Sequence, residues 1–167
     1  MKKLFLLLFV LALPLLASAQ IRFGVFSYDT VLKSMSDYIM AQRTIDGLRQ
    51  KYDSEMKRSE QEFNAKYEEF LEEQRDLVPA ILRKRQTEIQ EMTEKNVAFK
   101  QEAQRLLSQA EADALTPVKR KLNEAVAKVG AQQGYAFILN TDGDACPYIN
   151  PEMGEDATEA IRAELNK

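Results

Sequence analysis

Apolar residues recur at a fixed interval through the middle of the chain. Two sets are spaced seven residues apart, namely Met56, Phe63, Phe70 and Leu77, and then Met92, Phe99 and Leu106. A step of seven residues returns to one face of an α-helix, so the pattern predicts two helices with a narrow, coiled-coil-like apolar seam. The seam becomes fuller between residues 115 and 129, where apolar residues follow in steps of three and four.

Pro79 decides how these helices are arranged. Residues 37–129 have the composition of a helix, but a proline inside a helix costs about 3 kcal/mol. Ser27 lies 52 residues before Pro79 and Tyr135 lies 56 residues after it. A chain reversal near residues 76–80 would make two arms of nearly equal length and place Pro79 in the first turn of the second helix. Pro117, inside the returning arm, predicts a local bend.

Short apolar segments flank the helical region and predict strands. "IRFGVFS" (21–27) and "YAFILN" (135–140) are expected to pair in one small sheet once the arms return. Asp142-Gly143 is a hairpin turn signal, so "CPYIN" (146–150) is expected to be the returning strand. Asp29 is a candidate N-cap for a short helix after the first strand. The long helix is expected to stop after Val129, where "GAQQG" (130–134) offers two glycines for termination, and a last helix closes the chain.

The predicted fold class is therefore α+β. A long antiparallel α-helical hairpin (37–129, tip near 76–80) projects from a small β-rich body made of residues 20–36 and 130–167. Three short strands and a narrow seam cannot bury enough surface for a stable monomer, so self-association is expected.

The first nineteen residues resemble a signal peptide. Lys2 and Lys3 precede an apolar run from Leu4 to Leu16, and Ala17-Ser18-Ala19 matches the small-x-small site of signal peptidase. Cleavage between Ala19 and Gln20 is expected, with an uncleaved anchor as the alternative. The mature chain would then hold 21 basic and 26 acidic residues, a formal charge of −5. This balance argues against general nucleic-acid binding.

Candidate chemistry is sparse. The chain has no histidine, no phosphate-binding glycine loop and no visible catalytic constellation, so neither an enzyme nor a cofactor is expected. Asp142 and Asp144 surround Gly143, but the loop lacks the spacing of an EF-hand, which favours a plain turn without metal. Cys146 is the single cysteine; it is either a semi-buried free thiol or a link between chains.

Three segments together resemble the Skp (OmpH-like) family of periplasmic chaperones for outer-membrane proteins. They are "IRFGVFSYDTVLKSMSDY", the charged helical hairpin, and "VAKVGAQQGYAFILNTDGDACPYINPEMGEDATEAI". The resemblance implies a periplasmic homotrimer whose arms enclose a cavity for unfolded outer-membrane proteins. Its function would be that of an ATP-independent holdase that prevents aggregation during transit. The alternative function is a structural envelope adaptor that binds one fixed, folded partner.

Candidate contact residues follow from this resemblance. The apolar residues available to a client in the outer arms are Phe63, Tyr67, Phe70, Met92 and Phe99. Packing within the hairpin is their alternative role. Four basic residues near the tip are candidates for contact with clients or with membrane phosphates, or are simply solvated: Arg75, Arg83, Lys84 and Arg85. The resemblance also implies basic arms that bind lipopolysaccharide, but residues 37–129 hold 17 bases and 18 acids, which leaves that property open.

Overall fold

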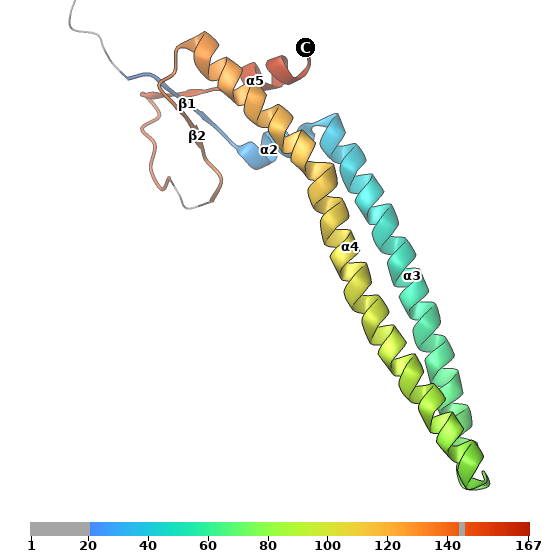
Figure 1. Cartoon of the computed structure of the whole chain (residues 1–167). Coiled ribbons are helices and arrows are strands. Elements are labelled where there is room, and N and C mark those ends of the chain that lie inside the picture. The colour runs from blue at the N-terminus through green and yellow to red at the C-terminus, as the bar shows by residue number, and fades with distance from the viewer. Residues whose placement is uncertain (1–20, 144–145) are drawn as a thin grey trace, which may run out of the picture. The chain divides into compact units, whose positions relative to one another are not determined.

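The protein is mostly helical with one small sheet. The computed structural model describes residues 21–143 and 146–167. The elements in chain order are β1 (Phe23–Phe26), α2 (Tyr28–Ser34), α3 (Ser36–Glu73), α4 (Pro79–Gln133), β2 (Ile138–Asn140), β3 (Gly154–Asp156) and α5 (Thr158–Leu165) (Figure 1). The chain divides into two compact units. Unit 1 contains the described residues up to Leu32 together with Arg120–Lys167, and unit 2 is Lys33–Lys119.

Unit 2 consists of α3, a turn, and the first part of α4. Helix α4 begins at Pro79, and the carbonyl of Val78 accepts the backbone N–H groups of Ile81 (2.9 Å) and Leu82 (3.0 Å). The N–H that Pro79 lacks would have had no partner within the helix, so the proline ends the preceding turn and starts the helix at little cost. Pro117, in contrast, lies inside α4, which continues past it to Gln133.

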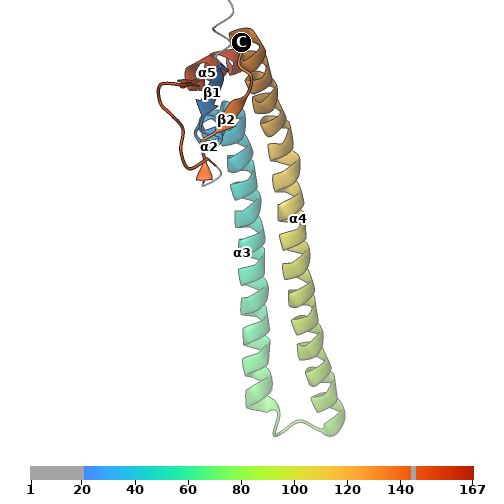
Figure 2. The same ribbon diagram turned by 90° about the vertical axis from the view of Figure 1, so that its left-hand side faces the viewer.

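Helix α3 and the first part of α4 lie side by side in both views (Figures 1 and 2). The rings of Tyr52 and Phe99 are 6.2 Å apart. Further along, the hydroxyl of Ser59 donates to the side-chain oxygen of Asn96 (2.9 Å). The period of seven predicted this narrow seam. Its burial is slight, because none of residues 46–102 is buried and the nearest buried side chains are Ile45 and Ala103.

Unit 1 holds the sheet, whose strand order is β2-β1-β3. Both outer strands run parallel to β1, and Gly24 stands opposite Ile138 in β2 and Glu155 in β3. The predicted pairing of 21–27 with 135–140 is therefore confirmed. The largest fully buried side chains of this unit, Val31, Leu122 and Ile161, come from α2, α4 and α5, and Phe26 of β1 is buried as well.

The predicted hairpin after residue 140 is wrong. Described residues 146–150 form no strand, and the third strand is Gly154–Asp156, parallel and not antiparallel to its neighbour. Gly143 does adopt a turn conformation (φ 72°). This turn contacts the start of α2 instead of joining two strands. The Asp142 carboxylate accepts hydrogen bonds from the Ser27 hydroxyl (2.6 Å) and the Asp29 N–H (2.7 Å).

Two helix ends also differ from expectation. The cap of α2 is Ser27 and not Asp29, since the Ser27 hydroxyl oxygen accepts the Thr30 N–H (3.1 Å). Helix α4 continues through Gly130 to Gln133, and Gly134 follows with φ 68°, a left-handed conformation that glycine adopts without strain.

An exposed polar cluster attaches β3 to the rest of unit 1. The Arg22 guanidinium donates two hydrogen bonds to the Glu155 carboxylate, both 2.8 Å, and a third to the Gln133 carbonyl (3.1 Å). The Tyr135 hydroxyl also donates to Glu155 (3.0 Å). These bonds, Arg22 first, hold the pKa of Glu155 below its ordinary value. The ends of β1, β3 and α4 are thus linked by side chains as well as by backbone pairing.

The predicted signal peptide and its cleavage site between Ala19 and Gln20, like Asp144, lie outside the described residues. Among the helices that the structure describes, none combines the length and the apolar character needed to cross a membrane.

Candidate functional site

In the part of unit 2 that leads to the turn between α3 and α4, polar side chains lie among the half-buried apolar ones of the seam. Ser59 and Asn96 meet across the seam, and the Asn96 amide also contacts the Ser59 carbonyl (3.5 Å). Polar residues at seam positions fix the alignment of paired helices at a cost in stability. The two helices are therefore held in register here without forming a thick core.

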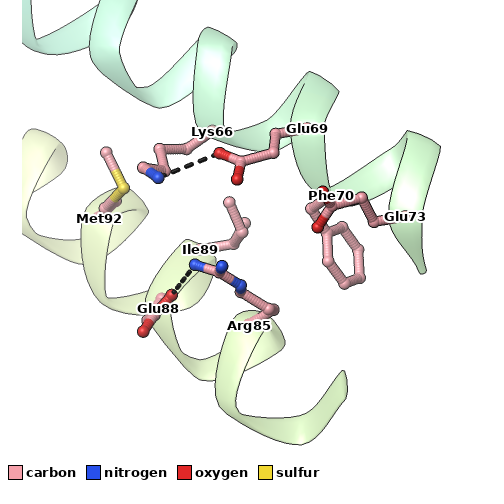
Figure 3. A pocket seen from close by; sticks show the side chains of 8 residues that line it. All are labelled: Lys66, Glu69, Phe70, Glu73, Arg85, Glu88, Ile89 and Met92. Carbon is pink, nitrogen blue, oxygen red and sulfur yellow. Dashed lines mark hydrogen bonds and ion pairs between the residues drawn. The ribbon is translucent and has the colours of Figure 1, made fainter. Parts of the chain in front are cut away.

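A charged layer lies nearer to the turn between α3 and α4 and is made of Lys66, Glu69, Arg85 and Glu88. These residues line a small hollow between α3 and α4 together with Phe70, Glu73, Ile89 and Met92. Phe70 and Ile89 point toward the facing helix, while Lys66–Glu69 (3.0 Å) and Arg85–Glu88 (3.1 Å) pair along their own helices (Figure 3). The Lys66 ammonium, helped by Arg85, holds the pKa of Glu69 below its ordinary value.

An apolar row runs along α3 from the edge of the seam to the exposed surface, made of Phe63, Tyr67 and Leu71. Their spacing of four residues places them on one helix face, and the rings of Phe63 and Tyr67 stack with centroids 5.8 Å apart. Phe63 is half-buried, whereas 42% of Tyr67 and 46% of Leu71 is exposed. Exposed apolar residues grouped in this way are characteristic of a binding surface.

The turn between the helices adds further exposed apolar groups. Val78 is 62% exposed and Ile81, one turn into α4, is 42% exposed. Arg75 lies in the turn, and Arg83 and Lys84 lie in the first turns of α4; all three are exposed. This end of unit 2 therefore combines apolar and cationic side chains.

Comparison with known proteins assigns the chain to a family. A family model described as "Outer membrane protein (OmpH-like)" matches residues 22–165. The chain belongs to the OmpH-like family. The match covers all the helices and strands that the structure describes in both units.

One solved structure has the same OmpH-like fold. It is a crystal structure from Caulobacter crescentus CB15 of a protein named, as a proposal, an OmpH-like outer membrane chaperone. The two share 18% sequence identity with a TM-score of 0.72, over 90% of this chain and 86% of the other. At this identity the likeness shows a common fold. No match was found among curated proteins.

The structure separates the five apolar candidates of this OmpH-like chain. Phe70 and Met92 come together at the hollow, and Phe99 packs near Tyr52 in the seam. All three are half-buried, which is the geometry of packing between the helices. Phe63 is half-buried as well and stacks on Tyr67, which is exposed, so Tyr67 is the candidate that is accessible without any opening of the seam.

The basic candidates also fall into two groups. Arg85 is half-buried in the charged layer, paired with Glu88. Lys84 approaches Glu88 more loosely (3.7 Å). Within the described part of the chain, Arg75 and Arg83 make no ion pair, so they are the two of the four basic candidates most available to a partner.

Sequence reasoning overlooked several residues of this surface. Leu71, Val78, Ile81 and Val97 are exposed apolar residues of unit 2 that the period of seven does not include. The spacing of Leu71, four residues after Tyr67, was the available signal. No cluster of three or more metal-ligating side chains occurs in the residues that the structure describes.

Proposed function

We propose that this OmpH-like protein is a periplasmic, ATP-independent chaperone that binds unfolded outer-membrane proteins and prevents their aggregation. The observation that carries the proposal is the family match over residues 22–165. Unit 2 supports it with accessible apolar groups on a scaffold that buries none of residues 46–102. Many weak, dispersed contacts suit the capture of unrelated clients and their release without ATP.

The proposal includes the arrangement of the subunits. α3 and α4 form an antiparallel helical hairpin that serves as an arm, and three chains associate into a homotrimer through their β-rich bodies. Contacts between residues 52 and 99 and between 59 and 96 support the antiparallel hairpin, because the residue numbers change in opposite directions. The protein has no enzymatic activity and needs no cofactor in this scheme.

Client binding is assigned to the outer half of unit 2. The apolar row and the exposed Val78 and Ile81 supply apolar contact, while Arg75 and Arg83 contact clients or, transiently, membrane phosphates. Each such contact is weak by itself, so none is indispensable.

The test is suppression of aggregation without ATP. A urea-denatured outer-membrane β-barrel protein is diluted into buffer with the mature protein at one trimer per client, and turbidity is followed. We expect the wild-type protein to suppress the rise in turbidity. Tyr67→Ser with Leu71→Ser should suppress it less. The matched control removes two exposed apolar residues of unit 1, Tyr148→Ser with Met153→Ser, and should behave as wild type.

Two outcomes would count against the proposal. Unchanged turbidity with wild-type protein would exclude the chaperone function under these conditions. An equal loss in both double variants would exclude the assignment to unit 2. Light scattering after size-exclusion tests the trimer independently, and a mass corresponding to one chain would overturn it.

A further inference from the structure

The apolar row has a distinctive border on α3. Glu60 and Glu68 lie three residues before Phe63 and Leu71, and residues three apart are neighbours on a helix surface. Glu72 continues the same line four residues after Glu68. We call these three glutamates the acidic row. Only Asn64 interrupts the line, so one flank of an exposed apolar surface is negatively charged along its length.

This charge is not neutralised within unit 2. Residues 60–73 contain six acids and one base, and that base, Lys66, pairs with Glu69 on another face of α3. Within the described chain none of the three glutamates of the acidic row forms an ion pair. Their charges are therefore available to a partner, next to the exposed ring of Tyr67 and side chain of Leu71.

We propose that the apolar row and the acidic row together bind an amphipathic, basic segment of an unfolded polypeptide. Such a segment would carry aromatic or aliphatic side chains against Tyr67 and Leu71, and Lys or Arg side chains against the acidic row. Charge complementarity selects this occupant, because an anionic surface or an acidic peptide would be repelled by the same glutamates. The inference rests on the proposed chaperone function and specifies which client segments unit 2 prefers.

The experiment uses two synthetic peptides as probes. Both have the same leucine and phenylalanine positions; one has lysine and the other glutamate at the polar positions. Binding to the full-length mature protein is measured by fluorescence anisotropy at low and at high salt. The test variant is Glu60→Gln with Glu68→Gln and Glu72→Gln. The matched control, Glu91→Gln with Glu111→Gln and Asp113→Asn, removes the same charge from exposed positions of α4.

We expect the lysine peptide to bind more tightly than the glutamate peptide at low salt, and the difference to shrink at high salt. The test variant should weaken binding of the lysine peptide roughly five- to tenfold, since each exposed charge pair contributes little alone. The control should change it less than twofold. Circular dichroism of all variants should match wild type, because every substituted side chain is exposed.

Three results would overturn the inference. One is equal binding of the two peptides, another is an equal effect of the test and control variants. The third is a change in oligomeric mass in the test variant alone, which would make this face a contact between copies of the chain. Failure of the proposed function is distinguishable: a protein that suppresses aggregation but shows no peptide preference retains the function and loses only the inference.

Discussion

The two units are stabilised in different ways. In unit 1, Val31, Leu122 and Ile161 are completely buried. In unit 2, no residue between 46 and 102 is buried, and the helices meet through half-buried side chains, the Ser59–Asn96 pair and the charged layer. Burial of apolar area is the main favourable contribution to folding, so unit 1 should be the more stable unit per residue. Unit 2 leaves its apolar groups accessible, which is what a binding surface requires.

Truncating an isoleucine in each unit tests this contrast most strongly. Ile161→Ala should lower the free energy of unfolding by about 3–4 kcal/mol, because the completely buried side chain leaves a cavity. Ile89→Ala, at the hollow in unit 2, should cost only about 1 kcal/mol since solvent already reaches the site. Urea unfolding followed by circular dichroism measures both. Equal losses would show that the seam is packed as tightly as the core.

The two prolines of α4 give the next largest effect. Pro117→Ala should raise stability by about 2–3 kcal/mol, because it restores a hydrogen bond inside the helix. Pro79→Ala should change stability by less than about 0.5 kcal/mol, because Pro79 is the first residue of α4. Thermal unfolding of both variants is the measurement. A large gain from Pro79→Ala would place that residue inside a continuous helix and contradict the turn at residues 74–78.

Replacing two glycines by alanine should change the free energy of unfolding in opposite directions. A Cβ on Gly24, in β1, would lie 3.1 Å from the Tyr135 ring and 3.2 Å from Ile138, so Gly24→Ala should cost about 1–2 kcal/mol. A Cβ on Gly47, in α3, would meet nothing within 4 Å, so Gly47→Ala should add about 0.5–1 kcal/mol through helix propensity. Urea midpoints would reveal both. If the urea midpoint shifts in the same direction in both variants, Gly24 is not more tightly packed than Gly47.

The smallest effect concerns pH. Arg22 lowers the pKa of Glu155 in the folded protein. The interaction therefore stabilises unit 1 fully at pH values above the ordinary pKa of glutamate, which is about 4.3. The contribution is lost as the pH falls through the lowered pKa of Glu155. Glu155→Gln should therefore be less stable than wild type at neutral pH, with a difference that narrows on acidification. A pH-independent difference in urea midpoint would exclude the ion pair as its cause.

The elements that sequence reasoning found are those with a strong local pattern. The step of seven identified the two long helices, and the fixed φ of Pro79 marked the start of the second. The equal arm lengths predicted that 21–27 and 135–140 would pair, which Gly24 opposite Ile138 confirms. These features follow from periodicity, backbone stiffness and chain length, all of which can be read without knowledge of tertiary contacts.

The missed elements depend on distant partners. β3 (Gly154–Asp156) has the sequence "GED", with no β-branched or aromatic residue, and becomes a strand because β1 offers it hydrogen bonds. Asp142 has the local signature of a hairpin, yet its carboxylate binds Ser27 and Asp29, more than a hundred residues earlier. Arg85 is a different case, because it lies seven residues before Met92, and the step of seven could have placed it at the seam, apart from the exposed Arg83.

The position of β1 in the sheet determines when the protein can complete its fold. β1 is made early, but it lies between β2 and β3, which are among the last segments to be synthesised. Closing such a long loop is entropically costly and slow, whereas Ser59 and Asn96 are only 37 residues apart. Unit 2 can therefore assemble before the sheet forms. Unit 1 must wait until residue 156 is available, so a chain that ends prematurely keeps the outer helices but never acquires the sheet.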